Sequence, residues 1–310
     1  MSTKSVAFFT EAGSSRGMGH LVRLHTIHEE FTDSNYKCNF FLDSDISYDY
    51  KFSDIHYFSW ETFSLTQRYD IIFVDSYEAS REIYQRVSDS CNQAFFLDDY
   101  ERLVYPKGTI INFAPDAKEL FYKKENAVHR LLLGLIYIPL RKLIKEIKVA
   151  KKEQLFIMLG GSDVESLSVE ILASLEEIKL QKVIITNNAQ ILEELTHFAN
   201  TSVLYQPSDR ELLEAMASST IAISTAGMSI YELAYYNIPT LIVSVSHNQR
   251  VGQEQLLKHK LAYGTIELQS QSWKIELPKQ IEQLLASQTQ WNTIIDENGA
   301  QRILKEAISL

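Results

Sequence analysis

The chain has 310 residues, 45% of them hydrophobic, and its 30 basic residues against 40 acidic ones give a net charge of −10. The length and apolar content favour two medium domains, each with its own core, over one large domain. The acidic balance argues against broad electrostatic attraction to nucleic acid or to an anionic membrane, so any phosphate site must be local.

The first half of the chain alternates strand-like runs with helical periodicity, which predicts an α/β fold. Strand candidates lie at 6–10, 38–42, 70–75 and 94–99, with helices over 20–31 and from about 80. The last two candidates end in acids, Asp75 and the pair Asp98 and Asp99. Because open α/β sheets carry ligand-facing residues at the carboxyl ends of their strands, both positions are suited to substrate contact. For Asp98 and Asp99, a solvated loop is the plainer alternative.

A basic stretch, Arg141–Lys152, separates the two halves, and we expect one domain over 1–150 and a second over 151–310. The second half restarts the pattern with a buried run over 154–159 that ends in glycines. Further strands are predicted at 182–186, 201–204, 221–224 and 240–245, with helices between them. The sequence therefore predicts an α/β protein of two Rossmann-like domains that face each other across a cleft.

A glycine-rich tetrapeptide, Gly17-Met18-Gly19-His20, follows the first strand and opens the first helix. The amides of a helix N-terminus favour anionic ligands, and Gly17 and Gly19 let the main chain approach them closely. An imidazole ordinarily titrates near neutral pH, so His20 is a candidate proton acceptor beside such a ligand. The alternative is that His20 only caps the helix or packs there.

The second domain offers a similar strand end for a diphosphate. Glu232, about one turn into the helix that follows, can accept hydrogen bonds from ribose hydroxyls, or it is an ordinary first-turn carboxylate favoured by the helix dipole. Gly160 and Gly161 either contact the ligand or simply form a strand–helix turn. The candidate ligand-binding residues of this domain are Gly160, Gly161, Ala226, Gly227, Met228, Ser229, Glu232, Asn248 and Gln249.

These segments occur in the order found in one known family. The matching segments are Gly17–Arg23, Asp75–Tyr77, Leu97–Asp99, Asn112, Gly134–Arg141, Gly160–Asp163 and Thr225–Glu232. Over nearly its whole length the chain resembles the UDP-sugar hydrolases of pseudaminic acid biosynthesis, which are related to the MurG-like nucleotide-sugar glycosyltransferases. The resemblance implies the two-domain glycosyltransferase-B fold.

The resemblance also implies a reaction: hydrolysis of UDP-2,4-diacetamido-2,4,6-trideoxy-β-L-altrose to UDP and the free sugar, with inversion and without a metal or other cofactor. In this reaction His20 is the general base that activates water. Tyr77 and Asp99 face the sugar, although Tyr77 could instead be a packing aromatic. Arg23 belongs to the matched ligand-binding segment. Asn248 and Gln249 contact the sugar or phosphate, and Glu232 contacts the ribose.

The chain departs from the family pattern upstream of the glycine loop. Where the family has Arg followed two residues later by Asp, this chain has Phe9 and Glu11. Glu11 can keep the role of the carboxylate with a longer reach, but Phe9 has neither the charge nor the donors of a guanidinium. This departure leaves the exact sugar open.

Two other functions compete with the hydrolase. A glycosyltransferase on the same scaffold could use the same base on an acceptor hydroxyl. The segment Gly134–Lys152, apolar and then basic, could serve a lipid acceptor, although a solvated charged face is the simpler interpretation. A non-catalytic nucleotide-sugar binding protein is the third possibility, and the presence of His20 disfavours it.

The remaining features indicate a cytoplasmic protein that binds a UDP-sugar and UDP, without nucleic acid or stable membrane insertion, as a monomer or weak oligomer. The sequence contains no signal-like region and no apolar run of transmembrane length. Cys38 and Cys91 are far apart and are expected to be reduced, and the other histidines lack zinc-ligand spacing. Because the sequence stops at Leu310, we expect no fused acetyltransferase domain.

Overall fold

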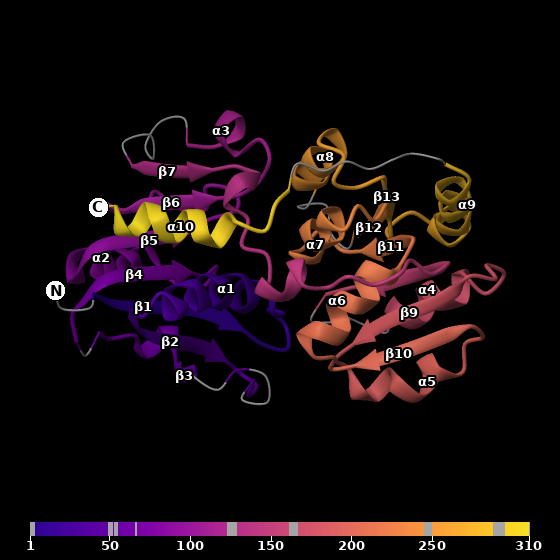
Figure 1. Ribbon diagram of the computed structural model, residues 1–310, viewed down its shortest axis with the longest axis horizontal. Helices are drawn as coiled ribbons and strands as arrows, with labels where there is room; N and C mark the ends of the chain where they lie inside the picture. The colour runs from indigo at the N-terminus through magenta and orange to yellow at the C-terminus, as the bar shows by residue number, and fades with distance from the viewer. Residues whose placement is uncertain are drawn as a thin grey trace. The chain divides into compact units, whose positions relative to one another are not determined.

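The computed structural model describes residues 4–48, 52, 55–65, 67–122, 129–160, 167–244, 250–287 and 295–309. It divides into two compact units, the first made of Met1–Arg141 with Asp296–Leu310 and the second of Lys142–Ile295 (Figure 1). No helix among these residues is long and apolar enough to cross a membrane.

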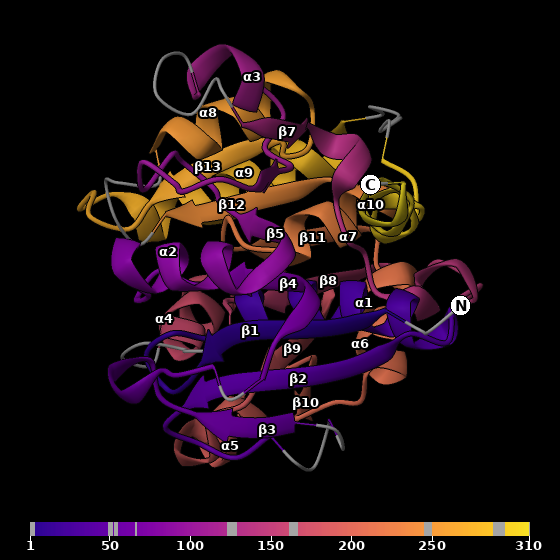
Figure 2. The same cartoon turned by 90° about the vertical axis from the view of Figure 1, so that its left-hand side faces the viewer.

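The first unit is built on a seven-stranded parallel sheet in the order β3-β2-β1-β4-β5-β6-β7. Figure 2 turns this unit toward the viewer, with β1, β2 and β3 side by side. Its strands are β1 Ser5–Ala12, β2 Lys37–Ser44, β3 Ile55–Phe58, β4 Tyr69–Asp75, β5 Cys91–Leu97, β6 Thr109–Asn112 and β7 Arg130–Leu133. Its helices are α1 Gly19–Asp33, α2 Arg81–Ser90, α3 Ala117–Leu120 and α10 Gly299–Ile308, with short 3-10 turns η1 Trp60–Thr62 and η3 Leu135–Tyr137.

The second unit has a six-stranded parallel sheet in the order β10-β9-β8-β11-β12-β13. Its strands are β8 Gln154–Met158, β9 Gln181–Thr186, β10 Thr201–Tyr205, β11 Ile221–Ser224, β12 Thr240–Ser244 and β13 Gly264–Glu267. Its helices are α4 Leu167–Ser174, α5 Leu192–Thr196, α6 Asp209–Ser218, α7 Ser229–Tyr235, α8 Arg250–Lys258 and α9 Trp273–Ala286, with 3-10 turns η4 Lys142–Lys145 and η6 Ala189–Ile191.

Each sheet has one point at which the chain order reverses direction. In the first unit this point lies between β1 and β4, and in the second between β8 and β11. Ligands of open α/β sheets bind outside the carboxyl ends of the strands at such a switch point. The loops that leave these four strands therefore lie where binding residues are expected.

The central strand β1 is buried on both faces, as parallel strands usually are. Phe8 packs on one face against Phe31, Phe40 and Phe73. Phe9 points to the other face and packs against an aromatic cluster of Phe41, Phe58, Trp60 and Phe63. Phe9, at the position where the resemblance led us to expect Arg, is therefore a core residue and is only 4% exposed.

The units differ from the expected domains at two points. The division falls after Arg141 rather than near residue 150, and the last helix, α10, belongs to the first unit. The reason is that α10 packs against α1 and η3 and buries its apolar face there, including Ala300, Ile303 and Ala307. An ion pair between Arg130 and Glu306 holds its far end.

The packing of α10 can be tested at its first residue, Gly299. A methyl group on Gly299 would lie 2.0 Å from the carbonyl oxygen of Ile138, so Gly299→Ala requires the backbone to move. We expect it to lower the free energy of unfolding by about 1–3 kcal/mol in urea titrations. Gly252→Ala, in α8 with no atom within 4 Å, is the control and should stabilise by up to about 1 kcal/mol. An unchanged Gly299→Ala midpoint would show that α10 is not packed on Ile138.

Candidate active site

The loop after β1 places His20 at the start of α1. Gly13 and Gly17 close the loop on itself through two backbone hydrogen bonds, Gly13 N to Gly17 O at 3.2 Å and Gly17 N to Gly13 O at 2.9 Å. Gly17 has φ +68°, a left-handed conformation that favours glycine. The tight turn brings the chain directly into α1, so His20 lies at the carboxyl edge of the first sheet.

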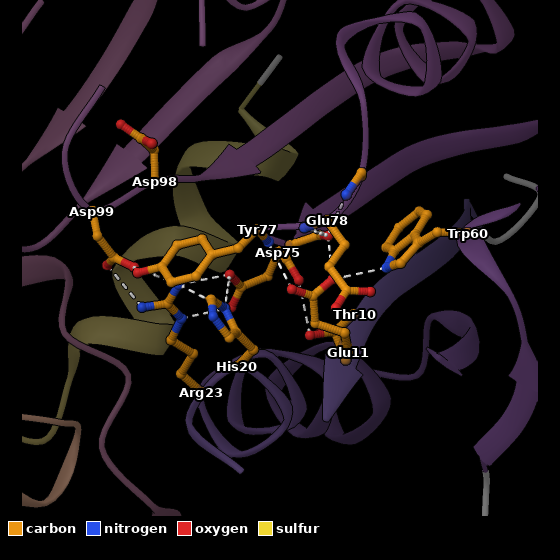
Figure 3. A network of polar contacts seen from close by, with 12 residues as sticks. Thr10, Glu11, His20, Arg23, Trp60, Asp75, Tyr77, Glu78, Asp98 and Asp99 are labelled. Atoms are coloured by element: carbon orange, nitrogen blue, oxygen red, sulfur yellow. Dashed lines mark hydrogen bonds and ion pairs between the residues drawn. The ribbon is translucent and has the colours of Figure 1, made fainter. Parts of the chain in front are cut away.

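Asp75 is the centre of a polar network at this edge (Figure 3). It ends β4 beside Thr10 of β1 and is fully buried. Its Oδ1 lies 2.6 Å from His20 Nδ1 and 2.6 Å from Arg23 Nη2, and its Oδ2 accepts from Arg23 Nε at 2.6 Å. Asp75 thus binds the guanidinium of Arg23 with two oxygens and the imidazole of His20 with one.

The ionisation of Asp75 bears on which nitrogen of His20 carries a proton. Burial works against its ionisation, but the Arg23 guanidinium and His20 outweigh burial and hold the pKa of Asp75 at about 2. An ionised carboxylate has no proton to donate and only accepts hydrogen bonds. The hydrogen in the 2.6 Å contact between Asp75 Oδ1 and His20 Nδ1 therefore belongs to His20. Arg23 Nη2 also lies 3.0 Å from this nitrogen, but it uses its two hydrogens on Asp75 and Asp99. We therefore assign a proton to Nδ1 of His20, which in the neutral imidazole leaves Nε2 as the acceptor.

Arg23 connects Asp75 to a second carboxylate, Asp99. Its Nη1 donates to Asp99 Oδ1 at 2.8 Å and its Nη2 to Asp99 Oδ2 at 3.0 Å. Burial raises the pKa of Asp99, but the charge of Arg23 more than compensates and lowers it overall. Arg23 is itself 6% exposed and lies over the ring of Phe113. The structure thus places Arg23, one of the predicted ligand-binding residues, between two carboxylates that it holds in position.

Tyr77 completes the network. Its hydroxyl donates to Asp99 Oδ2, and its ring packs edge-on against His20 with the ring centroids 4.4 Å apart. Partial burial and the neighbouring Asp99 raise the pKa of Tyr77, so the hydroxyl keeps its proton and remains a donor. Tyr77 is 44% exposed, and the side chain of Asp99 is 27% exposed. The structure therefore brings together the three predicted catalytic residues, His20, Tyr77 and Asp99. Tyr77 and Asp99 are partly exposed to solvent.

Asp98 has a different environment from Asp99. It is buried and accepts hydrogen bonds from the backbone N–H of Glu101 at 2.6 Å and of Arg102 at 3.1 Å. The hydroxyls of Tyr105 and Tyr122 also donate to it. In Figure 3 it points away from Asp99. Asp98 thus fixes the loop after β5 and is neither a solvated acid nor part of the cluster around His20.

In the second unit, the predicted ligand-binding loops gather at the switch point. Gly160 follows β8, and the loop Thr225–Met228 follows β11, whose Ser224 pairs with Met158 of β8. A Cβ on Gly160 would lie 3.5 Å from Thr225 Oγ1, and Ser229 Oγ donates to Met158 Sδ at 3.6 Å. Gly160, Ala226, Gly227, Met228 and Ser229 thus come together at one strand edge. Gly161, Asn248 and Gln249 lie outside the described residues.

Two further residues of this unit bear on ligand binding. Glu232 lies within α7 and is 2% exposed. The hydroxyl of Ser224 is fully buried at the end of β11 and has no hydrogen-bond partner within the described part of the chain. Across the same residues, no three His, Cys, Asp or Glu side chains form a group that could hold a metal ion.

Asp75 was not among the predicted catalytic residues, although it is the centre of the network in the structure. The available signal was its place as the last residue of a buried strand. What the sequence lacked was the pairing itself, because Asp75 is 52 residues from Arg23 and 55 from His20.

Comparison with known proteins supports the fold most strongly. No known protein-family model matches the chain. Over 192 residues the chain is 27% identical to a Helicobacter pylori (strain ATCC 700392 / 26695) protein described as pseudaminic acid cytidylyltransferase and UDP-2,4-diacetamido-2,4,6-trideoxy-beta-L-altropyranose hydrolase. This match covers 60% of the chain and 36% of that protein, so the chain spans about a third of the length of its curated relative.

Solved structures resemble the chain over nearly its full length. MurG of Acinetobacter baumannii matches with a TM-score of 0.65 at 10% identity, covering 99% of this chain and 100% of that one. UDP-GlcNAc 2-epimerase of Methanocaldococcus jannaschii, in complex with UDP-GlcNAc and UDP, matches with 0.67 at 8% identity and the same coverage. CalG4, the calicheamicin glycosyltransferase, matches with 0.63 at 11% identity, covering 100% and 95%. The two Rossmann-like sheets therefore have the glycosyltransferase-B type of fold, which confirms the predicted fold class.

Proposed function

We propose that this protein is a hydrolase that releases UDP from UDP-2,4-diacetamido-2,4,6-trideoxy-β-L-altrose, with water as the attacking group and inversion at the anomeric carbon. The observation that carries the proposal is the buried pair of Asp75 and His20, which orients an imidazole with Nε2 as a proton acceptor. The similarity to the Helicobacter pylori protein, whose description includes this hydrolase, supports the choice of substrate. The fold supports a nucleotide sugar as the substrate class.

In the proposed reaction, His20 Nε2 takes a proton from water as the water oxygen forms a bond to the anomeric carbon. The bond from that carbon to the β-phosphate oxygen breaks, and its electron pair leaves with UDP. His20 becomes cationic in this step, and the ionised Asp75 on its other nitrogen stabilises the positive charge. A positioned general base of this kind contributes a rate factor of about 10²–10⁴.

Tyr77 and Asp99 are proposed to face the sugar. Both retain solvent-exposed surface beside His20, whereas Arg23 behind them is buried. Asp99 can accept hydrogen bonds from sugar N–H or O–H groups, and the Tyr77 ring offers an apolar face to the ring or its methyl group. We assign these two residues to sugar binding next to the base.

The UDP group is proposed to bind at the switch point of the second unit. Gly160 and Gly227 lack side chains there, so a diphosphate can approach the main chain closely. Donors fixed at this position can stabilise the charge that builds on the leaving UDP. Asn248 and Gln249 are proposed to add donors to the sugar or phosphate. The Ser224 hydroxyl, which has no partner among the described residues, is a further polar group at the end of β11.

The test is UDP release from the proposed substrate by the purified protein, without an added acceptor, with the sugar followed by NMR. We expect UDP and a free sugar whose first-formed anomer is inverted relative to the substrate. A retained anomer would contradict direct attack by water. If the protein binds UDP but forms no UDP from the UDP-sugar, a MurG-like glycosyltransferase would replace the hydrolase as the proposed function. The same base would then deprotonate an acceptor hydroxyl.

The proposed contact between Glu232 and the ribose can be tested separately. If its carboxylate accepts hydrogen bonds from the ribose hydroxyls, Glu232→Ala should weaken UDP binding by about 10- to 100-fold, as expected for losing hydrogen bonds to a charged group. Isothermal titration with UDP measures this directly. Glu276, a partly exposed acid of α9, provides Glu276→Ala as a control that should leave the UDP affinity unchanged. An unaltered UDP affinity in Glu232→Ala would remove Glu232 from the ribose site.

A further inference from the structure

Glu11 is a buried carboxylate that the proposed reaction does not use directly. It is the next-to-last residue of β1 and is 2% exposed. It accepts hydrogen bonds from Trp60 Nε1 at 2.8 Å, from the Ser76 hydroxyl, and from the backbone N–H of Tyr77 at 2.7 Å. A buried carboxylate costs much free energy unless it is well paired, and three donors satisfy this one. Glu11 is thus committed to internal contacts.

The group that Glu11 holds is the loop that carries Tyr77. Ser76 Oγ accepts from the backbone N–H of Glu78 at 3.0 Å and of Ala79 at 2.8 Å while it donates to Glu11. The loop between β4 and α2 therefore turns around a single hydroxyl that Glu11 fixes. Glu11 binds this hydroxyl with Oε2 and the Tyr77 amide with Oε1, so both carboxylate oxygens hold adjacent residues of one loop.

This contact fixes Tyr77 at one end, and Asp99 fixes it at the other (Figure 3). Between these two attachments the ring lies edge-on against His20, at 4.4 Å between centroids and 83° between planes. Trp60, which donates to Glu11, is itself held in place because its backbone N–H donates to Asp43 at 2.7 Å. Glu11 thus connects a rigid part of the first sheet to the residue that covers the base.

We propose that Glu11 is a positioning residue for the reaction: its buried carboxylate fixes the backbone of Tyr77, so that the ring packs on His20 and the hydroxyl meets Asp99. The expected effect on turnover rests on the proposed function, whereas the positioning of Tyr77 by Glu11 does not depend on it. The glutamate side chain reaches both Ser76 and the Tyr77 amide from β1.

The first experiment needs no substrate. In protein labelled with ¹³C at the histidine rings, the His20 signal is assigned by its loss in His20→Asn. Tyr77→Leu removes the ring current on His20 and should shift this signal. Glu11→Gln should shift it in the same direction, because an amide at this position presents a donor to the Trp60 N–H or to the Tyr77 N–H. An unmoved His20 signal in a folded Glu11→Gln protein would overturn the inference.

The second experiment measures turnover. We expect Glu11→Gln to lower kcat on the order of 10- to 100-fold, with little change in KM, as a misplaced active-site group does. Glu78→Gln is the matched control, since it makes the same chemical change one residue beyond Tyr77 at a side chain that is 52% exposed, and it should keep full kcat. A kcat for Glu11→Gln equal to that of Glu78→Gln would contradict the proposal.

Two further variants test whether Glu11 acts by positioning Tyr77, rather than by stabilising the fold or by taking part in the reaction. Glu11→Asp keeps the charge but shortens the reach, so it should fold, shift the His20 signal and lower kcat in the same sense. In Tyr77→Leu, adding Glu11→Gln should change kcat less than it does in the parent, because Glu11 acts through Tyr77. If the parent protein releases no UDP, the proposed function fails, while the histidine signals still decide whether Glu11 sets the position of Tyr77.

Discussion

Replacing His20 with asparagine is expected to lower the rate of UDP release by about 10²–10⁴-fold, the usual contribution of a general base, while UDP affinity stays unchanged. Asparagine retains a nitrogen donor that can approach Asp75, so the buried carboxylate keeps a partner. It has no group that can take a proton from water at the position of Nε2. The rate is measured as UDP release at saturating substrate, and the affinity by titration with UDP.

The control for this substitution is His56→Asn, which makes the same change at an exposed histidine on β3 of the same unit. It should leave both the rate and the UDP affinity unchanged. If His20→Asn retained the rate of the parent, the imidazole would have no part in the mechanism. If it lost UDP affinity as well, His20 would act in binding rather than in proton transfer.

The nine strands that the sequence predicted correspond to β1, β2, β4, β5 and β8 to β12, and most of them are apolar runs, although Asp98 and Asp99 lie beyond the end of β5. The four strands that it missed, β3, β6, β7 and β13, are only four residues long. A run of four carries little periodic signal, and β11, which is equally short, was predicted from the small-residue loop and helix that follow it. The place of α10 was also missed, because which unit a terminal helix packs on depends on tertiary contacts that the local pattern does not contain.

The candidate site was predicted in outline through His20, Tyr77 and Asp99. Its electrostatic centre was not, because Arg23 pairs with Asp75 and Asp99 at sequence separations of 52 and 76 residues. The side-chain alternation of β1 could have shown that Phe9 and Glu11 share one face. It could not have shown that aromatic rings from β2, β3 and η1 enclose Phe9, or that Trp60 and Tyr77 donate to Glu11.

Replacing Arg23 with methionine is expected to cost about 3–5 kcal/mol of the free energy of unfolding at neutral pH, because it leaves the buried Asp75 charged without its main partner. Urea titrations followed by circular dichroism measure the change. Arg210→Met is the matched control, since Arg210 is 54% exposed and its carboxylate contacts are 3.6 and 3.8 Å long. A pair of this exposed kind contributes about 0–1 kcal/mol.

The pH dependence of this loss has a definite sign. In the parent, the pKa of Asp75 is lowered from 3.8 to about 2, so its ionised form contributes stability above its ordinary pKa, and this contribution disappears as pH falls through about 2. Without Arg23, burial is the largest influence that remains, and it raises the pKa of Asp75. The carboxyl of the variant can then be protonated at mildly acid pH, where the parent is still ionised. The difference in unfolding free energy between parent and Arg23→Met should therefore shrink from pH 7 to pH 4.

Adding Asp75→Asn to Arg23→Met provides the decisive comparison, because it removes the unpaired charge that the first substitution leaves. The double variant should recover at least about 1 kcal/mol relative to Arg23→Met, the coupling expected for residues in direct contact. It should also lose the part of the pH-dependent difference that comes from Asp75, while the part that comes from Asp99, whose pKa Arg23 also lowers, remains. If the double variant were as unstable at pH 7 as the sum of the two single variants, Arg23 would stabilise the unit by packing over Phe113 rather than by pairing with Asp75.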